Sequence, residues 1–208
     1  MTQATDHFIV RQAAPLDLDG MVDLVENCFA ADDNQRLLGK RVLRTIFDLL
    51  LASGKSLFLV VEADRRVAGF IWVQFTRLSP WRLVVFSPIR SLKLAYALAR
   101  ERKVAVLKRI GSEGGYSGGT VVSPRIVSLA VEEPFRKKGV GRLLVEESLR
   151  RLGAQGESSC FVATASQNEA AINFYRKNGF AVLDDGEKQM MFERKISTSD
   201  QAGAGKGV

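Results

Sequence analysis

At 208 residues, with 46% hydrophobic and 25% charged residues, the chain has ordinary globular composition and enough length for one sizeable domain. It has no apolar run as long as a membrane span and no signal peptide, and its two cysteines argue against a disulfide framework, so we expect a cytoplasmic protein. The net charge of +7 is uneven, because residues 77–112 contain nine Lys or Arg and a single acid, Glu101. That segment alone carries +8, so the fold as a whole need not bind polyanions.

Apolar periodicity predicts the first half of the chain as a strand, two helices and a hairpin. The predicted elements are a strand at 8–13, helices at 16–30 and 36–53, and strands at 57–63 and 67–75. Pro15 closes the first strand, and Gly54 follows the second helix as its expected C-cap. Both hairpin strands are rich in β-branched and aromatic residues, which is typical of buried strands.

Residues 77–120 do not continue this succession of short strands and helices. The Ser-Pro pair at 87–88 is an N-cap followed by proline in the first turn, so we expect a helix over about 89–110. Five glycines among residues 111–120 then predict a loop. We expect this basic, helical and Gly-rich insertion to be a solvated helix packed on the domain, a lid for an anionic acceptor, or a patch that touches a membrane or nucleic acid. Membrane contact through 77–112 is not the favoured reading, and no specific nucleic acid is expected.

The second half of the chain alternates strands and helices. We expect strands at 125–131 and 159–165, a helix beginning at Gly139, a helix at 168–178, and closing strands at 180–183 and 188–195. Ser166 and Glu169 stand at capping-box spacing before the second of these helices. The last residues, 197–208, contain nothing to bury and are expected to be disordered. We therefore expect one domain over residues 1–195, with the insertion at 77–120 inside it.

The turn that leads into the helix at Gly139 combines cations with small residues: Arg136, Lys137, Lys138, Gly139 and Gly141. The first amides of a helix have no partner within the helix, and the positive end of its dipole lies there, so an anion is the expected ligand. A diphosphate is the natural one, because the glycines allow close approach to the backbone. A dinucleotide fingerprint would need a glycine where Leu144 stands, and a P-loop would need a lysine where Arg142 stands.

Two motifs in this half belong together. One is Arg-x-x-Gly-x-Gly after the strand at 125–131, and the other is Asn-x-x-Ala-x-x-Phe-Tyr-x-x-x-Gly-Phe, which runs from Asn168 to Phe180. Together they resemble the GNAT superfamily of N-acetyltransferases. The resemblance is specific over 125–195, looser over 8–75, and absent from the insertion and the tail.

The resemblance implies an α/β (α+β) GNAT fold. Its centre would be a mixed, mostly antiparallel sheet of about seven strands, splayed between strands 4 and 5, with helices on both faces. The basic helical insertion would lie between strands 3 and 4.

The resemblance also implies acetyl-coenzyme A as a co-substrate, and no metal. Backbone groups of the strand would bind the pantetheine arm, the turn would cradle the diphosphate, and Asn168 would bind the arm near the thioester. The implied cofactor-binding residues are Leu129, Ala130, Val131, Arg136, Lys137, Lys138, Gly139, Val140, Gly141, Arg142, Asn168 and Tyr175. Tyr175 would also be the general acid that protonates the departing thiolate, and its alternative role is packing beside Phe174.

The general base is where the sequence departs from the family. Many relatives place a glutamate at the start of the strand, where this chain has Arg125. Ser128 is a candidate catalytic residue because its hydroxyl could hold a water, whereas Glu132 and Glu133 are expected to flank the turn at the surface. The only histidine, His7, lies in an N-terminal stretch expected to be disordered. No base is assigned.

We therefore expect an N-acetyltransferase that moves the acetyl group of acetyl-coenzyme A directly to a primary amine of a small molecule, such as an anionic amino sugar or an amino-acid-like acceptor. A protein or peptide amine is the alternative acceptor. A catalytically silent acyl-coenzyme A sensor is the alternative function, suggested by the missing strand glutamate. The expected partners are acetyl-coenzyme A and the amine, and the expected state is a monomer or a homodimer.

Overall fold

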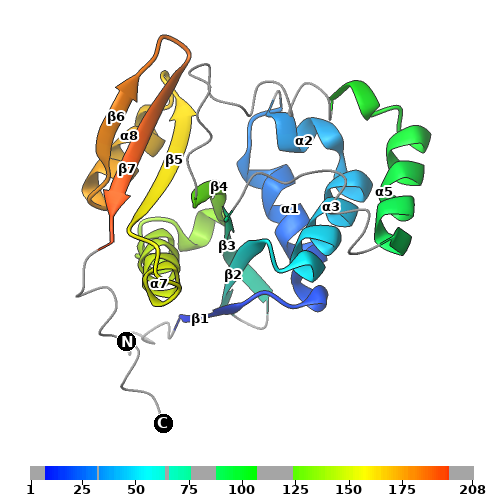
Figure 1. The fold of residues 1–208 in the computed structure, drawn as a ribbon, viewed down its shortest axis with the longest axis horizontal. Coiled ribbons are helices and arrows are strands. Elements are labelled where there is room, and N and C mark those ends of the chain that lie inside the picture. Colours follow the sequence, from blue (N-terminus) through cyan, green and yellow to red (C-terminus); the bar gives the residue numbers. More distant parts are fainter. Residues whose placement is uncertain (1–7, 32, 64–65, 76–87, 107–123, 197–208) are drawn as a thin grey trace.

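The computed structural model describes residues 8–31, 33–63, 66–75, 88–106 and 124–196 (Figure 1). His7, the Gly-rich part of the insertion and the C-terminal tail lie outside the described residues, so the predictions made for them remain predictions.

The centre of the structure is one seven-stranded sheet in the order β1-β2-β3-β4-β5-β7-β6. The strands are β1 Ile9–Gln12, β2 Ser56–Ala63, β3 Arg66–Gln74, β4 Arg125–Val131, β5 Ser159–Ala165, β6 Ala181–Asp185 and β7 Gln189–Lys195. All neighbouring strands are antiparallel except β4 and β5, which are parallel. The mixed, mostly antiparallel sheet expected from the sequence is thus confirmed.

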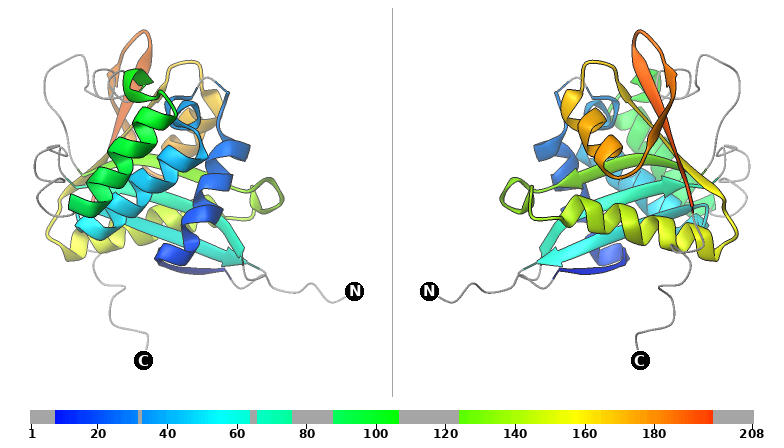
Figure 2. Two further views of the ribbon diagram at one scale, coloured as in Figure 1. Left: turned by 90° about the vertical axis from the view of Figure 1, so that its right-hand side faces the viewer. Right: turned by 90° about the vertical axis from the view of Figure 1, so that its left-hand side faces the viewer.

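Helices cover both faces of this sheet (Figures 1 and 2). They are η1 Pro15–Asp17, α1 Leu18–Cys28, α2 Asn34–Leu38, α3 Lys40–Ser53, α5 Pro88–Arg100, η2 Glu133–Phe135, α7 Val140–Ala154 and α8 Glu169–Lys177. The buried side chains of α1, α2 and α3 form one core with β2, β3 and β4, and those of α7 and α8 form a second core on the opposite face. The helix predicted to begin at Gly139 is confirmed as α7, and its buried residues, which include Leu144, Val145, Ser148, Leu149 and Leu152, form one stripe toward the sheet.

The single helix predicted at 36–53 is wrong, because it is two helices. Gly39 separates α2 from α3 with φ 78° and ψ 157°, a conformation that glycine adopts far more readily than other residues. A helical pattern of apolar residues on both sides hides such a break. The predicted C-cap at Gly54 is confirmed, with a left-handed φ of 63°.

The single helix predicted at about 89–110 is interrupted. α5 ends at Arg100, Arg102 takes a left-handed backbone with φ 53°, and residues 104–106 are helical again. The Lys103 amide closes this end by donating to the Leu98 carbonyl oxygen at 2.9 Å. α5 packs on α3, and in Figure 1 it is the outermost element, on the far side of the helical layer from β5. The described part of the insertion therefore does not cover the splayed strands.

Candidate functional site: the splay between β4 and β5

β4 and β5 pair over only two residues. The pairs are Arg125 with Phe161 and Ile126 with Val162. Farther along, β4 continues to pair with β3 as far as Val131, and β5 continues to pair with β7 as far as Ala165. The two strands therefore part beyond Ile126. We call the facing edges of residues 127–131 and 163–165 the β4–β5 splay. The carbonyl oxygens of Val127, Val131 and Ala165 accept hydrogen bonds from Gln35, Arg136 and Asn168. Between these points the edges have no strand partner across the splay and can meet an extended ligand.

β4 carries a bulge at the point where the two strands part. Trp72 of β3 lies opposite Ser128, and Val73 lies opposite Ile126, so Val127 has no partner on β3. A bulge bends its strand and increases its twist. Because this bulge directly follows the last pair between β4 and β5, it supplies a local cause for the splay.

Ser128 is buried beside the bulge, with 4% of its surface exposed. Its hydroxyl donates to Oε1 of Gln35 at 2.7 Å, and Nε2 of Gln35 donates to the Val127 carbonyl oxygen at 3.4 Å. Gln35 belongs to α2, so one side chain ties α2 to two consecutive residues of β4. With its proton engaged by Gln35, the Ser128 oxygen can still accept a hydrogen bond from a water or an amine.

Arg125 lies on the same face of the sheet as Ser128. Their partners on β3, Gln74 and Trp72, are two residues apart and so point to one face. The Arg125 guanidinium is half-buried, and this burial lowers its pKa from the usual value. An arginine still remains charged at neutral pH, so Arg125 can bind an anion but cannot replace a glutamate as a base.

The turn after β4 is held in place by Arg136. Its Nε donates to the Val131 carbonyl oxygen at 2.9 Å, which fastens the turn to the end of the strand. Lys138 lies over the ring of Phe135, with its Nζ 5.5 Å from the ring centroid. Arg136 therefore has a structural contact in addition to the cofactor role expected of it.

The start of α7 presents exposed cations around a left-handed turn. Lys137 has φ 61° and Gly139, the N-cap of α7, has φ 89°. Lys137 and Lys138 are exposed, so their charges add to the first amides and the dipole of a 15-residue helix, whereas the exposed Arg142 is paired with Glu146 at 2.7 Å. Val140 is different, because its side chain is buried in the core and only its backbone could face a ligand.

Gly141 faces α8. A Cβ at this position would lie 3.1 Å from Cε2 of Phe174, which is closer than an ordinary van der Waals contact. The structure therefore gives Gly141 a packing role, since it lets the first turn of α7 approach α8. Its predicted role in admitting an anion to the backbone stays a prediction.

The N-cap of α8 is Asn168, so the capping box predicted at Ser166 is wrong. Oδ1 of Asn168 accepts a hydrogen bond from the Ala171 amide at 3.1 Å. Ser166 instead donates to the Glu187 carbonyl oxygen at 2.6 Å, in the turn before β7. Asn168 is exposed, and capping the helix uses only its side-chain oxygen. Its side-chain NH₂ group can therefore still donate to a ligand, and the contact with the pantetheine arm stays a prediction.

Tyr175 lies inside an aromatic cluster on the inner side of α8. Its ring centroid is 5.3 Å from that of Phe174, 5.4 Å from that of Phe180 and 6.2 Å from that of Phe192. Burial, with a smaller effect from Cys160, raises the pKa of the phenol well above its usual value. Burial also raises the pKa of Cys160 to about 12, so this thiol is a core residue and not a nucleophile.

The remaining expected cofactor residues alternate along β4. Leu129 and Val131 pack toward the α7 side, and Ala130 packs toward the α1 side. This is the pattern of a strand that offers a ligand its backbone rather than its side chains.

The family model described as "Acetyltransferase (GNAT) family" matches residues 18–180. The chain belongs to the GNAT family of acetyltransferases. Within the part of this GNAT protein that the structure describes, no group of three or more His, Cys, Asp or Glu side chains could hold a metal ion.

A curated relative agrees with the family. An uncharacterised N-acetyltransferase of Chlorobaculum tepidum is 38% identical over 65 residues, which make up 31% of this chain and 39% of the relative. The match thus spans about two fifths of the relative's length.

Solved structures show the same fold. The PaiA N-acetyltransferase of Thermoplasma acidophilum in complex with coenzyme A has a TM-score of 0.60 at 16% identity, covering 90% of this chain and 98% of that one. The ribosomal-protein-S18-alanine N-acetyltransferase of Escherichia coli has a TM-score of 0.56 at 14% identity, covering 91% and 94%. At these identities, the likeness concerns the fold alone.

Gln35 is the residue near the candidate site of this GNAT protein that sequence reasoning missed. It is separated from Ser128 by 93 positions, and it lies in a five-residue helix whose sequence shows only a helical pattern. No local signal marks it, because its importance comes from the packing of α2 against β4.

We predict that Gln35→Ala lowers turnover roughly tenfold, about the value of one or two hydrogen bonds, without weakening the binding of acetyl-coenzyme A. The change removes the acceptor of the Ser128 hydroxyl and the donor to the Val127 carbonyl. Gln35→Glu keeps the acceptor but not the donor, so it should recover part of the loss. Steady-state kinetics with both substrates varied would separate kcat from the two KM values.

The double variant Gln35→Ala with Ser128→Ala provides the control. If Gln35 acts through Ser128, the two losses are not additive, because the second change removes nothing further from the pair. Additive losses would show that Gln35 does not position Ser128.

Proposed function

We propose that the protein is an acetyl-coenzyme A-dependent N-acetyltransferase that acts on a primary amine of a small, negatively charged molecule. The observation that carries the proposal is the β4–β5 splay with a cationic helix start at its outer end. It combines open backbone groups for an extended amide-containing arm with a site for a diphosphate at the end of the same strand.

The residues at the splay fit the cofactor. The exposed cations of the turn suit the diphosphate, and the edge of β4 beyond Ile126, which has no strand partner on the β5 side, suits the amides of the pantetheine arm. Asn168 is the N-cap of α8 and Tyr175 lies within α8. They complete the set of residues proposed to contact the arm and its sulfur.

The proposed reaction is direct transfer. The amine nitrogen attacks the thioester carbonyl carbon, an amide C–N bond forms, the C–S bond breaks, and the amine loses one proton as the sulfur leaves as a thiol. Free amines of this kind have a pKa near 10, so a proton must leave before attack. We propose that a water held by Ser128 carries this proton out, since no carboxylate stands at the start of β4 in this chain.

The burial of Tyr175 suits a hydrogen-bond donor. Because its pKa is raised, the phenol stays protonated at all pH values near neutrality, and it can always offer its proton to the departing sulfur. The same burial disfavours a lasting phenolate, so the proton it donates must be regained from solvent before the next turnover.

Arg125 supports an anionic acceptor. Arg125 and Val131 stand six residues apart on β4, which places them roughly 20 Å apart at about 3.3 Å per residue. Arg125 is therefore too far from the helix start to serve the diphosphate, and it shares a face with Ser128 at the inner end of the splay. A half-buried guanidinium there is suited to a carboxylate or phosphate on the acceptor.

A first prediction concerns the turn. Lys137→Asp should weaken the binding of coenzyme A roughly 10- to 100-fold, because it places a negative charge where the diphosphate is proposed to lie. The fold should tolerate the change, since aspartate accepts the left-handed backbone found at Lys137 better than most residues. Isothermal titration calorimetry would measure the effect.

Lys137→Asn is the matched control. Asparagine tolerates the left-handed backbone as aspartate does, but it removes the positive charge without adding a negative one. Its loss of affinity should be intermediate. Equal affinities for the wild type and Lys137→Asp would place the diphosphate elsewhere.

A second prediction tests the activity itself. In an assay of thiol release, we compare pairs of amines that differ only in carrying a carboxylate or phosphate. The anionic amine of each pair should have the higher kcat/KM. With the best acceptor, Tyr175→Phe should lower kcat roughly 10²- to 10⁴-fold and leave coenzyme A binding almost unchanged.

Two outcomes would count against this account. Turnover of Tyr175→Phe at the wild-type rate would leave Tyr175 only its packing role. Coenzyme A binding without thiol release from any amine, free or in a peptide, would favour a silent acyl-coenzyme A sensor.

A further inference from the structure

α5 has two apolar faces. Its inner face, formed by Leu94, Ala97 and Leu98, packs into the core shared with α1, α2 and α3. Its outer face bears Ile89, Leu92 and Tyr96, which are 73%, 72% and 62% exposed. Positions i, i+3 and i+7 form one stripe along a helix, so these three side chains make a continuous apolar ridge that points away from the protein. We call them the α5 ridge.

Cations border the α5 ridge. Lys93 and Arg100 are exposed and, by helical geometry, stand beside it, and Nη1 of Arg100 donates to the hydroxyl of Tyr96 at 3.1 Å. The only acid among residues 77–112 is Glu101, and the segment as a whole carries +8. Large apolar side chains flanked by basic residues are the composition of a helix that lies in the plane of a membrane surface.

The groove at the start of α5 also combines basic side chains with an exposed apolar one. It has a volume of about 550 Å³ and is lined in part by Ile89, Arg44, Arg90, Lys93 and Asp48. Arg44 is paired with Asp19 and Arg90 with Asp48, so Lys93 supplies the net positive charge of this groove, beside the exposed side chain of Ile89. An anionic headgroup is complementary to it in charge.

We propose that the α5 ridge docks this protein on an anionic membrane surface. Ile89, Leu92 and Tyr96 would enter the boundary between headgroups and acyl chains, and Lys93 and Arg100 would lie among the phosphates. None of the described helices is long and apolar enough to cross a bilayer, so the contact is one of surface attachment. The inference does not depend on the proposed catalytic activity.

Charge favours this occupant over a second copy of the chain. In a symmetric dimer through α5, each cation of one ridge would face the same cations of the other, and like charges close together repel. An anionic lipid surface instead neutralises them.

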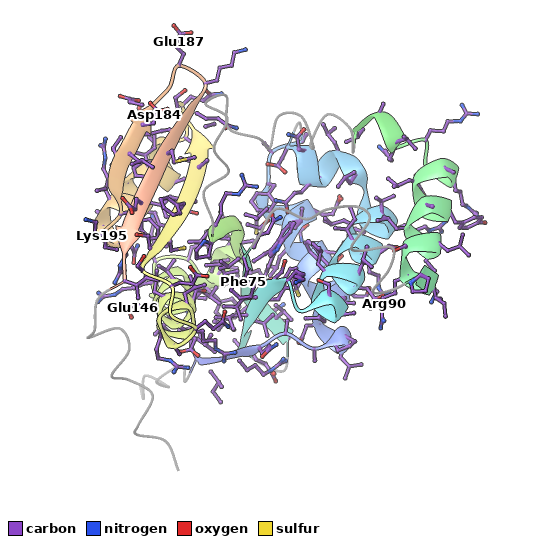
Figure 3. The ribbon with its side chains drawn as sticks, in the orientation of Figure 1. Phe75, Arg90, Glu146, Asp184, Glu187 and Lys195 are labelled. Atoms are coloured by element: carbon purple, nitrogen blue, oxygen red, sulfur yellow. The ribbon has the colours of Figure 1, made fainter. Side chains whose placement is uncertain are left out.

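Docking through α5 also leaves the candidate site open. Arg90, on α5, and Lys195, at the end of β7, lie toward opposite ends of the molecule (Figure 3). α7 and α8, which carry the proposed cofactor residues, belong to the end that bears Lys195 (Figure 1).

Flotation of the full chain with vesicles tests the proposal. The wild type should bind vesicles of roughly equal parts phosphatidylcholine and phosphatidylglycerol, should not bind phosphatidylcholine alone, and should be released at high salt. Lys93→Gln with Arg100→Gln should weaken binding roughly 25-fold, at about fivefold for each cation. Ile89→Ser with Leu92→Ser should weaken it roughly tenfold or more, because the apolar insertion is lost.

Matched variants in the β6–β7 hairpin are the controls. Lys188→Gln with Lys195→Gln removes the same charge, and Val182→Ser with Leu183→Ser removes exposed apolar side chains of similar kind. Both should bind vesicles like the wild type, and all four variants should bind coenzyme A like the wild type, which shows that they are folded.

Three results would overturn the proposal: no binding of the wild type to the anionic vesicles, equal losses in the α5 and control variants, or a wild-type dimer that Ile89→Ser with Leu92→Ser dissociates while vesicle binding is absent.

Discussion

The short contact between β4 and β5 is the constraint on which the rest of this structure depends. Two residue pairs join these strands, whereas every strand on either side pairs over four residues or more. The sheet is thus two antiparallel units that meet at a narrow junction. The bulge at Val127 bends β4 just after this junction, and the backbone edges that result have no partner in the sheet. A ligand with its own amide groups can complete them, which is why we propose the opening as the cofactor site.

The two faces of the sheet hold this junction in different ways. On one face, α7 packs on β1 to β4 and α8 packs Tyr175 against Phe192 of β7, and the lack of a Cβ at Gly141 leaves room for Phe174 of α8 beside the first turn of α7. On the other face, Gln35 fixes the bulged part of β4 to α2. The cations of the turn lie beyond the Val131 end of β4 and the half-buried Arg125 lies at its start, whereas Tyr175 is buried among aromatic side chains on the α8 side. A single strand orders the proposed diphosphate, thioester and acceptor positions along its length.

The sequence was informative wherever a feature is local. Strands and helices followed from apolar periodicity, and the cationic turn at 136–142 could be recognised because a helix start needs only its own amides and neighbours to attract an anion. Predictions were wrong where two local signals compete. Asn168 and Ser166 are both good N-cap residues two positions apart, and the structure uses Asn168 because Ser166 bonds to the turn before β7. Gly39 interrupts a stretch whose apolar pattern is helical on both sides.

Other features depend on contacts that no local pattern shows. Gln35 matters only because α2 packs on β4, and Gly141 has a packing role only because Phe174 of α8 lies beside the first turn of α7. The exposure of the α5 ridge also depends on contacts that no local pattern shows. Periodicity shows that α5 has apolar residues on more than one side, but which side meets α3 is decided by the fold. The sequence therefore favoured an acceptor lid or a solvated helix, whereas the structure presents an apolar, basic ridge away from the candidate site.

Hydrogen–deuterium exchange with and without coenzyme A tests the central claim most directly, because it reads the backbone amides that the splay leaves open. The account predicts that the ligand slows exchange in β4 from residue 127 to 131 and at the start of α7, and that α5 is unchanged. Slowed exchange confined to other segments, or no change in β4 at a saturating concentration of coenzyme A, would contradict the claim that the β4–β5 splay is the cofactor site.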